Sequence, residues 1–232
     1  GAPQVRQRAF YFFWKNDRIP LLNFYSREHA KIEDVIAACG EGIVFNKNTP
    51  SKDPYYRFVL EVIHGGMTHA EFSKIAPASK ARDNDMYSYI ENAGYTYAQI
   101  GEWMAKEGYE EEVKKCAYRH EKLASGGEVM RRGTVVPKDY IGAFVGHYPK
   151  RLTHPVEDRY INHKEALAIM GMPDDFEVIK PKTNYNHICQ NVPVLTATDM
   201  ATEILAVLND ERPYYHIKTD YLLQDNTQKT NT

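Results

Sequence analysis

The sequence has few cysteines, and none of them lies in a pattern that binds zinc. Cys39, Cys116 and Cys189 are the three cysteines among 232 residues, and they lie far apart with no CxxC pair. A disulfide-stapled secreted fold and a zinc knuckle both need more cysteines at closer spacing. The cysteine content therefore excludes both classes and is typical of a protein in a reducing cytoplasm.

The sequence also lacks long apolar runs and a strong charge of one sign. No apolar run approaches the roughly 18 residues of a membrane-spanning helix, and the opening residues, GAPQVRQR, lack the apolar stretch of a signal peptide. The formal net charge is −2, so the chain as a whole indicates neither a membrane nor a nucleic-acid partner. We expect no membrane partner, and any basic surface must be local.

Sequence signals for metal and nucleotide binding are missing as well. The closest pair of histidines, His64 and His69, is separated by GGMT, a spacing that fits no helical ligand pattern. No GxGxxG or phosphate-binding loop occurs anywhere. We therefore expect no metal site.

The sequence contains enough apolar residues to form a core, and it contains several patterns typical of helices. The hydrophobic content is 43%. Amphipathic periodicity predicts helices over four ranges: 31–42, most of 54–123, 162–173 and 196–209. Asn162 is a good N-cap, and Glu165 three residues later completes a capping box, whereas Thr196 or Thr198 is expected to cap the last helix.

Strands are predicted in two places. AFYFFW at 9–14 is aromatic and apolar on both faces, which predicts a short strand buried inside a layered domain. Residues 134–149 favour short strands and turns. The fold class predicted is therefore mixed α/β, and the polar tail at 224–232 is expected to be disordered.

The stretch before the predicted buried strand carries unusual polar residues. Gln4, Arg6 and Arg8 fall on one side of an extended chain because side chains alternate in a strand. Arginine's planar fork suits phosphates and carbonyl oxygens, so the three residues could form a row of hydrogen-bond donors. The alternative is an edge strand with two solvated arginines.

A second basic stretch lies in the middle of the chain. Between residues 114 and 152 there are nine Lys or Arg and three acidic residues, in a chain of net charge −2. The pairs Arg131–Arg132 and Lys150–Arg151 suit phosphate contacts, and arginine also binds guanine edges. The alternative is a solvated charged face.

Three segments resemble ordered motifs of one family. GAPQVRQRAFYFF is similar to the Pro-Gln-x-Arg-x-Arg motif of the DNA (cytosine-5) methyltransferases, the eighth of their ten motifs. RYINHKEALAIMGMPDDF (159–176) resembles the ninth motif, and YNHICQNVPVLTATDMATEI (185–204) resembles the tenth. The interval between the eighth and ninth motifs corresponds to the family's variable target-recognition region.

The resemblance implies roles for individual residues. Arg8 would hold the flipped-out cytosine, Arg6 the DNA backbone, and Gln4 would be a positioning residue. Gln190 and Asn191 would contact S-adenosylmethionine, although Cys189-Gln190 replaces the family's Gly-Asn and the turn must then avoid positive φ or bear strain. Glu165 is interpreted as a capping residue, and the DNA-binding candidates Arg131, Arg132, Lys150 and Arg151 fall in the recognition region.

The resemblance also implies a division of labour. The family's Pro-Cys nucleophile, Glu-Asn-Val glutamate and Gly-rich cofactor loop are not in this sequence, since none of the three cysteines follows a proline. We expect a C-terminal part of such an enzyme, inactive alone, that shares S-adenosylmethionine with a second polypeptide carrying the N-terminal motifs. Its other partner would be double-stranded DNA in the cytoplasm of a bacterial or phage-infected cell.

The expected organisation follows the motifs. Residues 1–48 would end the sheet of a Rossmann-like catalytic domain, 49–155 would form a small irregular target-recognition domain, and 156–223 would hold motifs nine and ten with the closing helix. A non-catalytic DNA-binding or decoy module derived from such an enzyme is the alternative, and it predicts salt-dependent duplex binding by a monomer.

Overall fold

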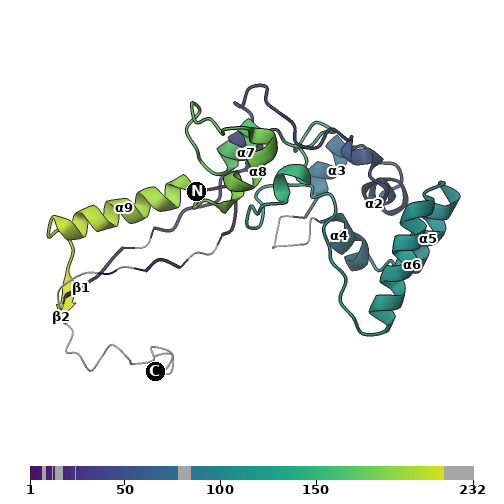
Figure 1. Cartoon of the computed structure of the whole chain (residues 1–232), viewed down its shortest axis with the longest axis horizontal. Helices are drawn as coiled ribbons and strands as arrows, with labels where there is room; N and C mark the ends of the chain where they lie inside the picture. The colour runs from purple at the N-terminus through teal and green to yellow at the C-terminus, as the bar shows by residue number, and fades with distance from the viewer. Residues whose placement is uncertain (7–8, 12, 14–17, 24, 78–84, 217–232) are drawn as a thin grey trace. The chain divides into compact units, whose positions relative to one another are not determined.

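The computed structural model describes residues 1–6, 9–11, 13, 18–23, 25–77 and 85–216. Its elements, in chain order, are β1 (Arg18–Pro20), α1 (Ile32–Ile36), η1 (Pro50–Lys52), α2 (Pro54–Phe58), η2 (Val59–Ile63), α3 (His69–Ile75), α4 (Met86–Asn92), α5 (Tyr97–Lys106), α6 (Glu110–Ala124), η3 (Tyr148–Lys150), α7 (His163–Ile169), α8 (Pro181–Gln190), α9 (Val194–Leu208) and β2 (Tyr214–His216). The described residues are therefore mostly helical, with little strand (Figure 1).

The chain divides into two compact units, which we treat separately. Unit 1 comprises Gly1–Gln7 and Glu28–Pro193, and unit 2 comprises Arg8–Arg27 and Val194–Thr232. The predicted segments 1–48, 49–155 and 156–223 have other boundaries than these two units, and they stay a prediction.

The first apolar cluster of unit 1 is built from α2 to α6 and is rich in aromatic residues. Tyr55, Tyr56, Phe58 and Phe72 are all 2% exposed or less. The helices begin at capping boxes, Thr68 with Glu71 in α3 and Thr96 with Gln99 in α5, which satisfy otherwise unpaired N–H groups. The helical prediction for most of 54–123 is therefore confirmed for the described residues.

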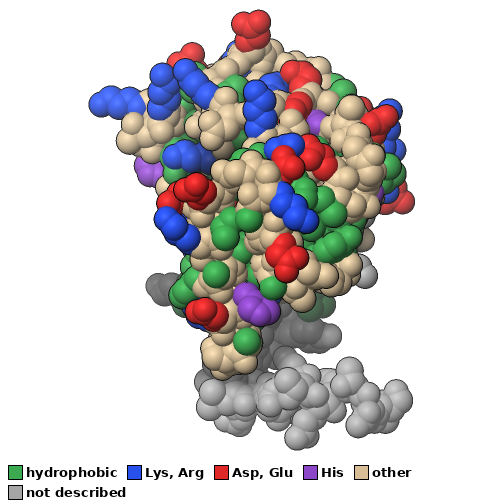
Figure 2. All heavy atoms as spheres, turned by 90° about the vertical axis from the view of Figure 1, so that its right-hand side faces the viewer, with side chains coloured by type: hydrophobic (Ala, Val, Ile, Leu, Met, Phe, Trp, Pro, Cys, Tyr) green, Lys and Arg blue, Asp and Glu red, His purple; other side chains and the backbone are tan. Residues whose placement is uncertain are grey.

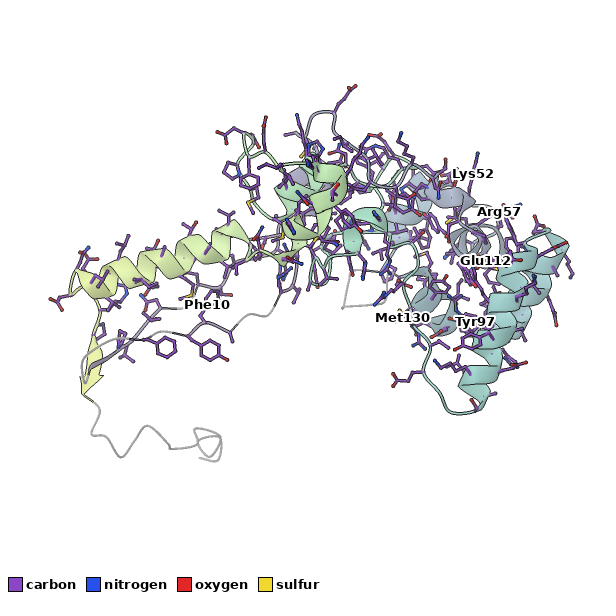
Figure 3. The ribbon with its side chains drawn as sticks, viewed as in Figure 1. Phe10, Lys52, Arg57, Tyr97, Glu112 and Met130 are labelled. Carbon is purple, nitrogen blue, oxygen red and sulfur yellow. The ribbon has the colours of Figure 1, made fainter. Side chains whose placement is uncertain are left out.

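Helices α5 and α6 form the tightest pair in this cluster. A Cβ placed on Gly101 would lie 3.3 Å from the Cβ of Cys116, which is tighter than an ordinary contact, so a larger residue would push the two helices slightly apart. Arg57 of α2, labelled in Figure 3, binds the turn between them, donating to the Tyr109 hydroxyl at 2.9 Å and pairing with Glu107 at 2.8 Å. The helices are thus held by packing, and their connecting turn by one guanidinium.

The second apolar cluster of unit 1 lies around α1, α7 and α8. Ile141, Phe144, Leu152 and Ile161 are buried in it, together with one face of each of these helices. The segments between 134 and 162 are joined by isolated bridges, such as Val135 with Leu152, rather than by long strands. The turns predicted over 134–149 are confirmed, but the short strands are wrong, because single bridges and the start of η3 occur in their place.

Unit 2 contains the two named strands and the last helix. β1 pairs antiparallel with β2, with Ile19 opposite Tyr215. Helix α9 starts at Val194, so the prediction that Thr196 or Thr198 caps it is wrong. Thr198 instead donates its hydroxyl to the carbonyl of Val194 inside the helix, at 2.9 Å.

The predicted buried strand at 9–14 is wrong for the described residues of that range. Residues 9–11 and 13 have no strand conformation, and Tyr11 and Phe13 are 80% and 95% exposed. A strand needs a neighbouring strand to satisfy its backbone, and none of the described residues pairs with this segment. The mixed α/β, Rossmann-like class therefore does not follow from the described elements.

Candidate functional site

The N-terminal segment of unit 1 lies against the loop after residue 140. Ile141 donates its N–H to the carbonyl of Pro3 at 3.0 Å, and Val5 donates to the carbonyl of Ile141 at 2.9 Å. These two bonds form a single parallel bridge between Gln4 and Ile141. The bridge fixes the direction in which the Gln4 and Arg6 side chains leave the backbone.

Gln4 is buried and joins three segments. Its side-chain oxygen accepts from Phe144 N at 3.1 Å, and its amide donates to the carbonyl of Ile169 at the end of α7, at 3.2 Å. Only 4% of the residue is exposed. This arrangement suits the positioning role predicted for Gln4, since a buried amide whose hydrogen bonds go to backbone groups of other segments holds those segments in place.

Arg6 uses its guanidinium within the chain. Nη1 donates to the carbonyl of Phe144 at 2.5 Å, and Nη2 donates to the carbonyl of Cys189 at 2.7 Å. Arg6 therefore ties the 141–144 loop to the end of α8, which carries Gln190 and Asn191. Arg8, the second arginine of the motif, lies outside the described residues.

The residues around Cys189 form a helix. Cys189 lies near the end of α8 and is 2% exposed, and burial raises the pKa of its thiol to about 12. Since a helical position needs no positive φ, cysteine in place of the family's glycine causes no backbone strain. Of the two expected alternatives, the chain therefore adopts the one that avoids positive φ.

The two candidate cofactor residues follow directly. Gln190 ends α8 with an exposed side chain, which has no hydrogen bond within the described residues. Asn191 is exposed as well, but its side-chain amide donates to the carbonyl of His187 at 2.9 Å. Gln190 is therefore available to a ligand, whereas the Asn191 amide also closes the end of the helix.

Two of the four DNA-binding candidates, Arg131 and Arg151, form ion pairs with carboxylates of unit 1. Arg131 pairs with Glu91 through Nε at 2.7 Å. Arg151 pairs with the nearly buried carboxylate of Asp85 and donates Nε to the carbonyl of Gly133 at 2.7 Å. Their charges are already partly neutralised by these carboxylates.

Asp85 is a central residue that no sequence pattern singled out. Its carboxylate accepts from Gly133 N at 2.8 Å and from Tyr87 N at 3.1 Å, in addition to its pair with Arg151. Burial raises the pKa of this carboxyl, although Arg151 acts in the opposite direction. Asp85 thus fixes the turn that presents Arg131 and Arg132.

The other two candidates are exposed. Arg132 and Lys150 both have exposed side chains, and neither forms an ion pair with a carboxylate in the described ranges. The ammonium of Lys150 lies 4.1 Å from the centre of the Tyr185 ring, a cation–π distance. Arg132 and Lys150 are therefore the members of this set that can reach an external phosphate.

The ninth-motif residues form a buried ion pair at the start of α7. Arg159 donates to both oxygens of Glu165, at 3.0 and 2.7 Å, and Glu165 is 2% exposed. Glu165 also accepts from Asn162 N at 2.8 Å, while Asn162 accepts from Glu165 N at 3.0 Å. The predicted capping box is confirmed, and Arg159 adds a fork that sequence reasoning did not foresee.

The described residues contain neither a cluster of metal ligands nor a single helix that could span a membrane. Across the described ranges, no group of three or more His, Cys, Asp or Glu side chains could hold a metal ion. No single described helix is long and apolar enough to cross a membrane, and α8 and α9 meet that test only when counted together as a bent pair.

The sequence of the chain matches one protein family. A family model described as C-5 cytosine-specific DNA methylase matches residues 1–206. No curated protein and no solved structure matches the chain. Since the matched range takes in most of the 232 residues, including the Gln4–Arg6 contacts and both later motifs, the chain belongs to the C-5 cytosine-specific DNA methylase family.

Proposed function

We propose that this chain supplies the target-recognition and closing part of a DNA (cytosine-5) methyltransferase, and that a second polypeptide completes the active site. The family methylates cytosine in DNA. The methyl donor would be S-adenosylmethionine, bound between the two polypeptides. The assembly would work in the cytoplasm of a bacterial or phage-infected cell.

The chemistry of the cysteines supports the need for a partner. Attack on C6 of cytosine requires a thiolate, because the thiol form is a poor nucleophile. Cys116 and Cys189 are 1% and 2% exposed, and burial raises the pKa of all three thiols. None of the three follows a proline. A thiolate on a Pro-Cys turn would therefore come from the second polypeptide.

The observation that carries the partner proposal is the apolar surface of unit 2. Phe13 is 95% exposed, Tyr11 80%, Leu208 72% and Leu205 60%. Phe10, labelled in Figure 3 on the segment before β1, is itself 38% exposed. Exposed apolar groups at this density mark interaction surfaces. We assign this surface to the apolar core of the catalytic domain that the second polypeptide would provide.

Each site residue has a role in this proposal. Arg8 would donate to the polar edge of the flipped cytosine and to the charge that develops on the ring. Gln4 and Arg6 would set the position of Arg8 through their contacts with Phe144 and Cys189. Gln190, whose exposed amide can bond polar atoms of S-adenosylmethionine, fits that ligand better than Asn191 does.

The DNA-facing side would use Arg132 and Lys150 for phosphate contacts. Arg131 and Arg151, which pair with Glu91 and Asp85, would act by holding the recognition loop in shape. Any base contact they make would then require those pairs to open.

The test begins with native mass spectrometry of the protein from its own host. We expect an assembly heavier than 26.7 kDa that contains a polypeptide with Pro-Cys and Glu-Asn-Val motifs. In that assembly, transfer of labelled methyl groups to duplex DNA should be lost in Arg8→Ala, while the assembly remains intact. Normal turnover by Arg8→Ala would refute the role of Arg8.

A matched control separates loss of charge from loss of the motif. Arg27→Ala removes an exposed arginine of the same unit, whose ion pair with Asp199 is screened by solvent, and should leave turnover unchanged. A lone 26.7 kDa species that binds duplex DNA in a salt-dependent way, with no methyl transfer, would instead favour the non-catalytic binding module.

A further inference from the structure

Three distant segments of unit 1 meet around a pair of aromatic rings. The rings of Phe45 and Tyr185 lie 5.5 Å apart, and the ammonium of Lys150 lies 4.1 Å from the Tyr185 ring centre. Asn46 donates its side-chain amide to the carbonyl of Lys150 at 3.0 Å. The loop at 42–49, the turn at η3 and helix α8 are therefore neighbours.

A hollow opens beside these rings. Its volume is about 520 Å³, and it is lined by residues of the loop at 42–49 and by Asp158, Arg159 and Lys182. Asn46, Asn48 and Thr49 are among the lining residues, so polar as well as charged residues surround the space. Lys47 and Lys182 stand on its walls, and Lys150 lies alongside, on the neighbouring Tyr185 ring.

The charges of this hollow do not cancel. Arg159 is paired with Glu157 and Glu165, and the carboxylate of Asp158 accepts from both the N–H and the hydroxyl of Ser51. Lys47, Lys150 and Lys182 form no ion pair with any carboxylate that the structure describes. The hydrogen bonds from neutral Ser51 leave the negative charge of Asp158 in place, but the three ammonium groups outnumber this carboxylate, so the unpaired charge around the hollow is net positive.

Two lysines of α6 are arranged differently. Lys114 and Lys115 on α6 pair with Glu111 and Glu112, at 2.8 and 2.5 Å. On the face that carries α5 and α6, acidic and basic side chains occur together (Figure 2). Lys182, in contrast, lies in the first turn of α8, before the non-helical backbone of Asn184, and no acidic residue accompanies it in that turn.

We propose that Lys47, Lys150 and Lys182 form a binding site for the phosphates of duplex DNA. The proposal rests on the function proposed above, and it adds two lysines that no family motif or basic run indicates. Lysine ammonium groups bind phosphate as point charges, and Asn46, Asn48 and Thr49 supply neutral donors beside them. The site extends the DNA surface from the recognition loops to the beginning of α8.

The experiment compares two triple variants of the full chain. One is Lys47→Gln/Lys150→Gln/Lys182→Gln. The control is Lys31→Gln/Lys74→Gln/Lys106→Gln, which removes the same charge from exposed positions outside the basic stretch, just before α1 and on α3 and α5. Binding of a labelled DNA duplex is followed by fluorescence anisotropy at several salt concentrations, and circular dichroism verifies that both variants are folded.

The expected result is a change in salt dependence. Each lost phosphate contact lowers the slope of log K against log salt by about 0.9, so the site variant should lose about 2–3 in slope and at least about tenfold in affinity at low salt. The control should lose less than about 1 in slope. An unchanged slope in the site variant, or equal losses in both variants, overturns the site. Failure of the unsubstituted chain to bind duplex DNA at low salt overturns the DNA-facing part of the proposed function, and the site with it.

Discussion

Units 1 and 2 are stabilised in different ways. Unit 1 buries two apolar clusters, and several of its large aromatic side chains, such as Tyr56 and Phe72, are fully enclosed. In unit 2, most large apolar side chains of the described residues remain exposed, and the most completely buried side chain of α9 belongs to the charged Glu203.

Glu203 is the centre of a polar network that holds unit 2 together. It accepts from both ends of the Arg212 guanidinium at 2.7 and 2.8 Å, from Asn23 N at 2.8 Å and from the Tyr25 hydroxyl at 2.8 Å. Charge-assisted hydrogen bonds are strong individually, but they replace water contacts and contribute little net stability compared with a packed core. Unit 1 therefore has packed apolar clusters of its own, whereas unit 2 relies on this polar network and leaves apolar side chains exposed, as expected if it docks on the partner proposed above.

The largest expected effect is in the core of unit 1. Phe72 is 0% exposed, and its ring contacts those of Tyr56, Tyr89 and His64 at centroid distances of 5.6, 5.3 and 5.2 Å. Phe72→Ala should lower the free energy of unfolding by about 3–5 kcal/mol, since it removes a buried ring and leaves a cavity. Urea unfolding followed by circular dichroism measures this change.

The control for this substitution is Tyr118→Ala on α6. Tyr118 is 61% exposed, so its removal should change the unfolding free energy by less than about 0.5–1 kcal/mol. Equal losses in the two variants would mean that the cluster around Phe72 is not the stabilising core of unit 1.

The local chemistry of unit 1 could be predicted from the sequence. The capping box of Asn162 and Glu165 depends on residues three positions apart, and its partners are fixed by helix geometry alone. The helices between 54 and 123 follow from apolar periodicity in the same way. Such features need no knowledge of the rest of the fold.

Contacts between distant segments could not be predicted. Arg6 binds the carbonyl of Cys189, 183 positions away, and Asp85 pairs with Arg151, 66 positions away. No local pattern marks a backbone carbonyl as the partner of an arginine, so Arg6 suggested an external phosphate instead. The prediction of a buried strand at 9–14 was wrong for a related reason. Apolar residues predict burial, but no local pattern says which other part of a protein covers them, and among the described residues Tyr11 and Phe13 are exposed.

The second prediction concerns unit 2 at acid pH. The hydrogen bonds from Arg212, Asn23 N and Tyr25 lower the pKa of Glu203 from its ordinary value of 4.5 to about 2. The contribution of this carboxylate is therefore fully present above about pH 4.5 and is lost as the pH falls toward 2. NMR chemical shifts of α9 amides should change over this interval, while those of α5 remain native.

Glu203→Gln provides the matching control for this titration. The amide has nearly the same shape but cannot titrate, and it cannot accept from both ends of Arg212 as a carboxylate does. In this variant α9 should already be destabilised at neutral pH and should show no further transition between about pH 4.5 and 2. A parent chain whose α9 signals do not respond to acid would refute the assignment of Glu203 as the centre of unit 2.

The smallest effect on stability is expected at Phe13, and it separates the two units most clearly. Because its side chain is 95% exposed, Phe13→Ser should change the unfolding free energy of the isolated chain by no more than about 0.5 kcal/mol. If the apolar surface of unit 2 docks on a partner, the same substitution should weaken assembly, since a buried Phe contributes about 1.5–3 kcal/mol, or about 10-fold to 100-fold in Kd. Native mass spectrometry of the assembly against dilution measures this loss. Unchanged assembly would mean that Phe13 stays in water in the complete enzyme, and the docking surface would then have to be sought on α9, at Leu205 and Leu208.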